Sequence, residues 1–370
     1  MSKTGRQKLC VGVDLHKHQF TVCAMSAKNE VVEHEGEYRT DPDGYKLFCD
    51  RMHWYELNCN YQIEVAVETT GNAKYFKNKM EKEGFGVTVV NTNKFKVITL
   101  STKKTDINDA TTLAYYLMKE MLPESHLCDQ TSEEIRRVLK TRSILVSSTV
   151  KIKNQIHGMM LGYGIETKSA QFQSKKKRQE LLHDLADQGF SEFTASSLEV
   201  TLSILDNIYA QIKMCEEQLN VMLENDATVR LLKTVPGIGP IGAATIASYT
   251  RDIERFDGDF KRFASYIGIV PSVHNSGETI HLGKITKHGP QELRTAFVQV
   301  AMGWIRMPQK TYSWKVMYDY RTMKVNKGSG RAIIALTRKI ARIVFVMLNT
   351  GTEFDASLMK LAEEKQDKTN

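Results

Sequence analysis

The stretch LCVGVDLHKHQFTVCAM, residues Leu9–Met25, decides the fold of the first third of the chain. An apolar run from Leu9 to Val13 ends at Asp14, and a second apolar run resumes at Phe20. Two short apolar runs separated by polar residues are typical of a β-hairpin. The sequence therefore predicts a hairpin that holds the carboxylate of Asp14 at the lip of a sheet.

A second carboxylate closes the next strand-like segment, IEVAVETTG. Ile63, Val65 and Val67 alternate as they would along a strand, and Glu68 follows them directly before the turn residues TTG. A third run, GVTVVN, continues the pattern. Strand-like and helix-like runs alternate up to about residue 125, so we expect an α/β domain in which Glu68, like Asp14, ends a strand.

Two further carboxylates stand at the start of a predicted helix, in KKTDINDATTLAYYLM. Asp106 and Asp109 precede an apolar face made of Leu113, Tyr116 and Leu117. Residues three apart on a helix share a face, so both acids can point at one spot.

Four carboxylates in this order point to metal-dependent phosphodiester chemistry. Each pair of like charges at about 4 Å costs on the order of 4 kcal/mol at an effective dielectric near 20, unless a cation lies between them. Hard oxygen ligands favour Mg²⁺ or Mn²⁺. Two such ions about 3.5–4 Å apart stabilise the attacking oxygen and the leaving oxygen of a phosphoryl displacement. The alternative is that each acid merely caps a strand or helix. His16 and His18 are interpreted as surface strand residues and not as ligands.

Composition agrees with an enzyme that handles nucleic acid in the cytoplasm. The chain has 370 residues, a net charge of +8 and a pI near 9.0, which favours a polyanionic partner. Composition alone equally fits a ribosome-associated or membrane-surface protein. The segment from Lys284 to Arg342 contains thirteen Lys or Arg residues and only two Asp or Glu residues. The C-terminal third therefore carries most of the chain's excess positive charge. The six cysteines contain no C-x-x-C pair and are interpreted as reduced. We find no signal sequence and expect no membrane span.

The middle of the chain predicts two long helices. One covers Ser132 to Met160, and the second runs from about Glu192 to Glu224. The second carries a heptad repeat of Leu198, Leu205, Ile212 and Leu219, with Ile208, Cys215 and Met222 at its second position. This spacing predicts a coiled-coil seam within the chain or between protomers; a helix packed on its own domain's core is the alternative.

The last third contains two motifs that bear on nucleic acid. In LLKTVPGIGPIGAATIASY, two helices joined by a turn with Gly237 and Gly239 predict a helix-hairpin-helix, whose backbone N–H groups approach a phosphate. A plain helical turn is the alternative. Further on, Ser276 directly before Gly277 offers a loop hydroxyl with room for a bulky substrate, although Ser-Gly is also a common turn.

Several motifs together resemble a known family. The order GVDLHK, VAVETTG, KTDINDATTLAYYL, VPGIGPIGAATIAS, FASYIGIVPSVHNSG and LGKITKHGPQELRTAFVQVA is similar to the DEDD transposases of bacterial insertion sequences. These are recombinases guided by a structured bridge RNA that their own element encodes. The resemblance extends from about residue 9 to residue 350.

The resemblance implies a ribonuclease H-like, RuvC-type catalytic domain at residues 1–128, whose acidic tetrad is Asp14, Glu68, Asp106 and Asp109. A helical coiled-coil segment at 129–226 would lead to a mainly helical C-terminal transposase domain at 227–351 and a flexible tail at 352–370. Ser276 would be the nucleophile. The family often shows two adjacent serines before the glycine, where this chain has Asn275 and Ser276.

The implied activity is transposition, with donor and target DNA cut and rejoined by Ser276 and carboxylate-bound Mg²⁺ or Mn²⁺. The implied partners are DNA, a structured guide RNA and further copies of the chain, from dimer to tetramer, in the bacterial cytoplasm at the nucleoid. Two alternatives stay open: a Holliday-junction resolvase-like nuclease with water as nucleophile, and a nucleic-acid-binding protein without catalysis. The residues expected to bind nucleic acid are Lys104, Gly237, Gly239, Lys284, Lys287 and Arg294.

Overall fold

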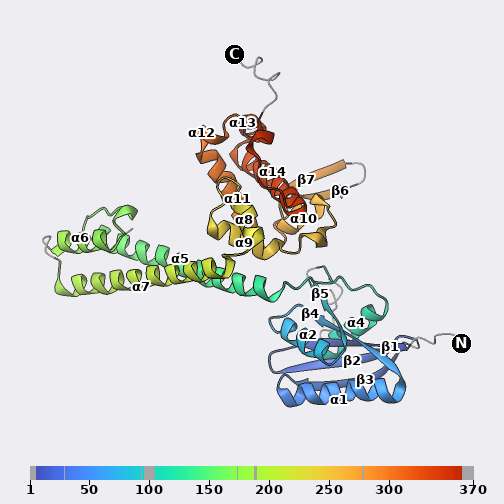
Figure 1. The fold of residues 1–370 in the computed structure, drawn as a ribbon. Coiled ribbons are helices and arrows are strands. Elements are labelled where there is room, and N and C mark those ends of the chain that lie inside the picture. The colour runs from blue at the N-terminus through green and yellow to red at the C-terminus, as the bar shows by residue number, and fades with distance from the viewer. Residues whose placement is uncertain are drawn as a thin grey trace. The chain divides into compact units, whose positions relative to one another are not determined.

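The computed structural model describes residues 6–28, 30–92, 94–95, 105–172, 174–186, 190–276 and 279–360. The chain forms two compact units, Met1–Leu127 and Cys128–Asn370, which are drawn as a ribbon in Figure 1. In the described part of the chain, no helix is both long and apolar enough to cross a membrane.

The first unit is built on a five-stranded sheet with strand order β3-β2-β1-β4-β5. The strands are β1 (Gln7–Leu15), β2 (Gln19–Ser26), β3 (Val31–Arg39), β4 (Tyr61–Glu68) and β5 (Gly86–Val90). The first three strands are antiparallel neighbours, β4 runs parallel to β1, and β5 runs parallel to β4. The predicted hairpin is therefore confirmed as β1 and β2, and the mixed sheet is consistent with the expected RuvC-like fold.

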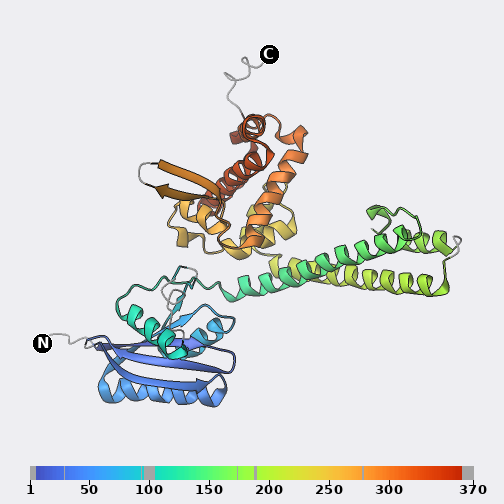
Figure 2. The ribbon, with the colours of Figure 1, turned by 180° about the vertical axis from the view of Figure 1, so that it is seen from behind.

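Helices cover both faces of this sheet (Figures 1 and 2). The helices of this unit are α1 (Pro42–Cys59), α2 (Ala73–Lys82) and α4 (Asp106–Met118). Side chains alternate between the two faces of a strand. Val11 and Val13 thus share one core with Phe48 of α1 and Phe76 of α2. Gly12 and Ala66 face the other way and lie under α4, which packs on β1, β2 and β4.

The second unit begins with a long helical hairpin. Its elements are α5 (Gln130–Leu161), η1 (Ser169–Phe172), α6 (Lys175–Ala186) and α7 (Glu192–Leu223). Both long helices were predicted with bounds close to these. Leu198, Leu205, Ile212 and Leu219 are buried, and α7 packs along α5, so the heptad seam is filled within the chain. At the tip of the hairpin, next to Leu161, η1 and α6 close a small apolar core with both helices.

The rest of the second unit is mainly helical. Its elements are α8 (Ala227–Lys233), α9 (Pro240–Thr250), η2 (Ile253–Phe256), α10 (Phe260–Ile267), β6 (Pro271–Ser276), β7 (Thr279–Ile285), α11 (Gln291–Arg306), α12 (Pro308–Thr311), α13 (Lys315–Lys327), α14 (Ser329–Thr350) and η3 (Ala356–Met359). Their core also includes Ile135 of α5 and Leu223 of α7. The root of the hairpin, where α5 begins and α7 ends, is therefore built into this core.

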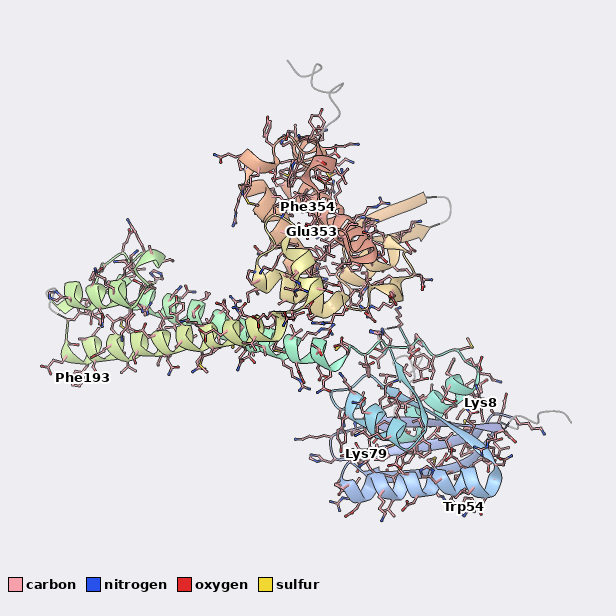
Figure 3. The ribbon with its side chains drawn as sticks, in the orientation of Figure 1. Lys8, Trp54, Lys79, Phe193, Glu353 and Phe354 are labelled. Atoms are coloured by element: carbon pink, nitrogen blue, oxygen red, sulfur yellow. The ribbon has the colours of Figure 1, made fainter. Side chains whose placement is uncertain are left out.

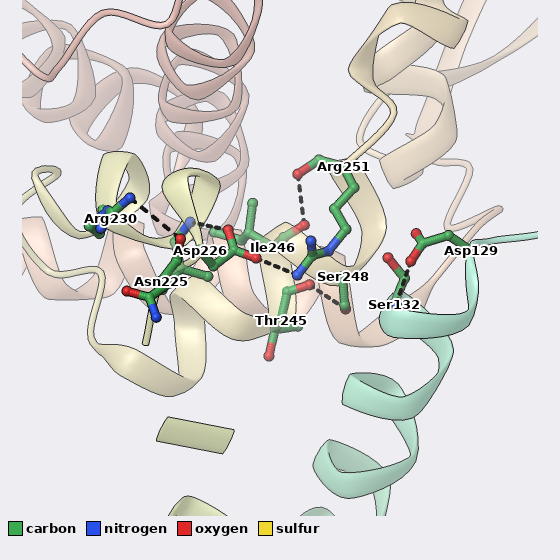
Figure 4. Close-up of polar contacts among 11 residues, drawn as sticks. Asp129, Ser132, Asn225, Asp226, Arg230, Thr245, Ile246, Ser248 and Arg251 are labelled. Atoms are coloured by element: carbon green, nitrogen blue, oxygen red, sulfur yellow. Dashed lines mark hydrogen bonds and ion pairs between the residues drawn. The ribbon is translucent and has the colours of Figure 1, made fainter. Parts of the chain in front are cut away.

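Polar contacts fix the same root. The guanidinium of Arg136 donates from Nε to the backbone oxygen of Ser248 over 2.9 Å, and it lies 3.9 Å from the ring centroid of Tyr249. Arg251 after α9 pairs with Asp226, which caps α8 (Figure 4). A guanidinium that satisfies a carbonyl and stacks on a ring is held in a fixed orientation. The hairpin therefore enters the C-terminal core through α9.

One residue of the segment 352–370, which was predicted to be a flexible tail, packs against the C-terminal core. Phe354, labelled in Figure 3, packs against Trp304 and Trp314 at ring-centroid distances of 6.1 and 5.6 Å. Its backbone N–H donates to Thr234 Oγ1 over 3.0 Å. The side chain and backbone of Phe354 therefore attach the start of this segment to the core. Residues 361–370 lie outside the described residues.

Candidate active site

Two of the predicted acids lie at the ends of neighbouring parallel strands. Asp14 lies near the end of β1 and is 8 % exposed, whereas Glu68 is the last residue of β4 and is half-buried. Val13 pairs with Val67 across these strands, so Asp14 and Glu68 each follow that pair by one residue. Both side chains therefore point to the sheet face that α4 covers.

The other two acids arrive on α4, whose first turn contains Asp106 and Asp109. Thr105 caps the helix, since its side chain accepts a hydrogen bond from Asn108 N over 3.3 Å. The helix then crosses β1 so closely that a Cβ on Gly12 would lie 1.9 Å from Ala110 O. This contact fixes how far the first turn of α4 lies from Asp14, two residues beyond Gly12.

His16 belongs to this site, although its sequence context had indicated a surface strand residue. It lies in the turn after β1, and its Nε2 is 3.2 Å from Asp14 Oδ2 and 3.5 Å from Asp106 Oδ2. The three side chains offer ligand atoms that all lie within 4.8 Å of one another. The turn itself is fixed by Asn72, whose Nδ2 donates to His16 O over 3.1 Å. No local sequence signal could separate His16 from His18, because the placement depends on α4.

The electrostatics of the site show crowded negative charge. Burial raises the pKa of Asp14, the nearby His16 lowers it, and the carboxylates of Asp106 and Asp109 raise it again. Charges that oppose each other's ionisation in this way are relieved by a cation. Carboxylate oxygens are the donors that hard divalent ions prefer, and an imidazole nitrogen adds a borderline ligand. Asp14, Asp106 and His16 therefore fit a divalent metal ion.

Ser276 belongs to the second unit. It is the last residue of β6, and its backbone pairs with that of Thr279 in β7. The side chain of Ser276 and the whole of Gly277 lie outside the described residues, as does Lys104. At the base of the hairpin that carries Ser276, Thr286 N donates a hydrogen bond to Val270 O over 2.9 Å. The two strands are thus joined where they leave the helical core.

Arg294 closes the base of this β6–β7 hairpin. Its Nη1 donates to Ile267 O over 3.0 Å and to Lys287 O over 3.2 Å, so one guanidinium joins both ends of the hairpin. Arg294 was predicted to bind nucleic acid; in the structure its guanidinium makes contacts within the protein that the sequence did not show. Lys284 and Lys287 are exposed and remain predicted phosphate contacts.

Replacing Arg294 by alanine is expected to lower the free energy of unfolding by about 2 kcal/mol, because hydrogen bonds from a charged donor are lost. Lys284→Ala is the matched control. It should leave the free energy of unfolding unchanged and weaken DNA binding. The slope of the logarithm of the DNA-binding constant against the logarithm of the salt concentration should become shallower by about 1, because one phosphate contact is lost. Urea unfolding and DNA binding at several salt concentrations measure both effects. If Arg294→Ala is as stable as the wild type, the guanidinium does not hold the hairpin base.

The predicted phosphate-binding turn lies between α8 and α9. Gly237 has a φ of +85° and Gly239 caps α9 without a side-chain hydrogen bond, and both glycines are exposed. Trp304 Nε1 donates to Pro236 O over 2.6 Å and so fixes the turn on α11. Two helices and a glycine turn are present as predicted, and phosphate binding by this turn remains a prediction.

Comparison with known proteins agrees with this arrangement. A DEDD transposase model of the IS110 type matches residues 11–165, and a model described as the transposase IS116/IS110/IS902 family matches residues 229–316. The transposase for insertion sequence element IS1111A of Coxiella burnetii is 23 % identical over 341 residues, which cover 91 % of this chain and 89 % of that protein. The transposase for insertion sequence element IS1328 of Yersinia enterocolitica is 25 % identical over 298 residues, covering 78 % and 85 %.

The pilin gene-inverting protein of Moraxella lacunata is also similar, with 26 % identity over 257 residues and 68 % of both chains covered. The mixed sheet, its acids and the two family matches define the class of the protein, a DNA-processing enzyme of the DEDD type. The chain belongs to the IS110/IS116 family of insertion-sequence transposases. Membership in this family implies the use of a divalent metal ion.

Proposed function

We propose that this transposase cuts and rejoins donor and target DNA with Ser276 as the nucleophile, while Asp14, Glu68, Asp106 and Asp109 hold Mg²⁺ or Mn²⁺. The observation that carries the proposal is the meeting of Asp14 and Asp106 around His16 on the α4 face of the sheet. A cluster of carboxylates whose charges oppose each other is the expected form of a site for a hard divalent ion.

The chemistry assigned to Ser276 is a reversible exchange of phosphate esters. Its Oγ attacks the phosphorus of a DNA strand, the new Oγ–phosphorus bond forms, and the bond from phosphorus to the leaving strand oxygen breaks. The proton of the serine hydroxyl is released and the leaving oxygen takes one up. The hydroxyl of the new partner strand then displaces Ser276. When bound, the divalent ion would supply positive charge that stabilises the transferring phosphate.

Partner recognition is proposed to follow the same family pattern. A structured guide RNA would select donor and target by base pairing, and the basic residues between Lys284 and Arg342 would contact nucleic-acid backbone, Lys284 and Lys287 among them. Lys104 and the turn with Gly237 and Gly239 would add backbone contacts.

Assembly into dimers or tetramers is proposed on the surface of the helical hairpin. Met214 and Val221 of α7 are 51 % and 78 % exposed. Together with Val138 and Met222 they line a groove of about 660 Å³ between α5 and α7. Glu134, Arg137, Glu217 and Gln218 line the same groove, so a second copy of the chain would meet both apolar and charged side chains there. Because Ser276 and the acids belong to different units, assembly would allow one active site to combine units of two protomers.

The test is recombination between a donor and a target plasmid in cells that carry the chain with its native flanking DNA. Ser276→Ala and Asp106→Asn should each abolish recombination, because one removes the nucleophile and the other a ligand of the metal ion. Ser313→Ala is the control, since Ser313 is an exposed serine of the same unit outside the β6–β7 hairpin. A protein–DNA adduct that survives denaturing electrophoresis should form with the wild type and be absent with Ser276→Ala.

Activity that survives Ser276→Ala but not Asp106→Asn would contradict the serine mechanism and support a resolvase-like nuclease that uses water. The RNA is tested separately, by expressing the chain without its flanking DNA. Recombination should then be lost and should return when the flanking DNA is supplied on a second plasmid. Full activity without the flanking DNA would contradict guidance by an RNA encoded there.

A further inference from the structure

A buried hydroxyl lies beside Asp14 and takes no part in the site as described so far. Thr21 on β2 is the antiparallel partner of Asp14 on β1. Directly paired residues on neighbouring strands point to the same face, with Cβ atoms about 4.5–5.5 Å apart. Thr21 is only 1 % exposed. Its hydroxyl therefore lies under the protein surface, next to the buried carboxylate.

The hydroxyl of Thr21 is unusual because it is unpaired. Within the described residues, its Oγ1 has no hydrogen-bond partner. Most buried polar groups are hydrogen-bonded, and an unpaired one lowers stability. Valine has the same branched shape, suits a strand equally well and would not leave a polar atom unsatisfied. An unpaired threonine in this position therefore indicates a use for its hydroxyl that the metal-free protein does not satisfy.

Two acids flank Thr21, Asp14 on β1 and Glu37 on β3. Glu37 is exposed and can be solvated by water, whereas Asp14 is 8 % exposed. A buried carboxylate depends on protein donors for its hydrogen bonds. A threonine hydroxyl reaches different neighbours by rotation about χ1 between staggered positions. Asp14 is therefore the neighbour with the greater need for this donor.

We propose that Thr21 is a positioning residue for the metal site. When the carboxylate of Asp14 ligates a divalent ion, the hydroxyl of Thr21 donates to that carboxylate and fixes its orientation. Outer-shell donors of this kind commonly change metal affinity by about 10- to 100-fold. The inference rests on the metal site in the proposed function, and it adds a residue that the four-acid pattern does not contain.

The experiment measures Mn²⁺ binding by the full-length protein, with Mn²⁺ alone as the probe. The signal of free Mn²⁺ in electron paramagnetic resonance gives the affinity, and thermal unfolding without metal gives Tm. Thr21→Val should weaken Mn²⁺ binding about tenfold and raise the Tm of the metal-free protein, because the unpaired hydroxyl is gone. Thr21→Ser should bind Mn²⁺ as the wild type does. Thr21→Ala, a second variant without the hydroxyl, should lose affinity to the same extent as Thr21→Val.

Thr337→Val is the matched control. Thr337 is also fully buried, but its Oγ1 donates to Ile333 O over 2.8 Å. The same substitution there should lower Tm and leave Mn²⁺ binding unchanged. If Thr21→Val raises Tm and weakens Mn²⁺ binding, while Thr337→Val lowers Tm and leaves Mn²⁺ binding unchanged, the effect of Thr21 on the metal is not a consequence of altered stability.

Two results would overturn the assignment of Thr21 alone. One is wild-type Mn²⁺ affinity in Thr21→Val and Thr21→Ala while Asp106→Asn weakens binding; the other is a lower Tm in metal-free Thr21→Val. A wild type that binds no Mn²⁺ would overturn the metal site itself, and with it the carboxylate part of the proposed function. The failure of the inference and the failure of the proposed function are thus distinguishable.

Discussion

Gly12→Ala is expected to destabilise the first unit by about 3 kcal/mol, at the upper end of the cost of overpacking. The new methyl group would lie 1.9 Å from Ala110 O and 2.5 Å from Ala114 N. Both atoms belong to the backbone of α4, which can only yield if the helix moves away from the sheet. Asp106 and Asp109 would move with it. Because a misplacement of about 1 Å costs on the order of a hundredfold in rate, recombination should be lost as well.

Urea unfolding of the full chain, with hydrogen exchange followed in β1 and α4, measures the change. Gly71→Ala is the control in the same unit, since a Cβ at Gly71 would meet nothing within 4 Å. The control should be as stable and as active as the wild type. Wild-type protection and activity in Gly12→Ala would mean that the spacing between α4 and the sheet does not set the geometry of the acids.

Asp14→Asn is expected to abolish recombination while stabilising the metal-free protein. The pKa of Asp14 is raised, with burial as the main cause, so the folded state holds the proton more tightly than the unfolded chain does. Above the folded pKa, the ionised carboxylate therefore reduces stability, and the neutral amide removes that penalty. Metal-assisted phosphoryl transfer gains several kcal/mol from such a ligand, so activity should fall by more than about a thousandfold.

Thermal unfolding with and without Mg²⁺ is the corresponding measurement. The wild type should gain stability as Mg²⁺ is added, because a ligand that binds only the folded state stabilises it. Without Mg²⁺, Asp14→Asn should have a higher Tm than the wild type, and added Mg²⁺ should raise that Tm only slightly. A variant that is less stable than the wild type without metal would show that the ionised carboxylate is satisfied by the protein alone.

The sequence predicted those parts of the site that depend on local pattern. Asp14 and Glu68 follow short apolar runs of the kind that strands contain, and Asp106 begins a segment with a clear helical face. Parallel neighbours at the centre of a sheet then bring strand ends together. The long helices were predicted for the same reason, because their apolar positions repeat over many turns.

Contacts between distant segments could not be predicted from one sequence. His16 enters the site only because α4 places Asp106 beside the turn after β1. The base of the β6–β7 hairpin depends on Arg294, 27 residues beyond the Ile267 carbonyl that it binds. Phe354 stands in a polar segment, and its partners Trp304 and Trp314 are far away in the sequence. In each case, charge or composition alone suggested a surface residue.

The root of the helical hairpin has a mechanical consequence. With 32 residues, α7 is about 48 Å long, and its end near Leu223 is embedded in the same core as α9 and α14. A tilt of about ten degrees at the root would carry the far end of such a helix through about 8 Å. A small rotation at the contact between Arg136 and the end of α9 is thus amplified into a large displacement at the far end of the hairpin. Conversely, a force that a bound partner applies at the far end would exert a large torque on the C-terminal core.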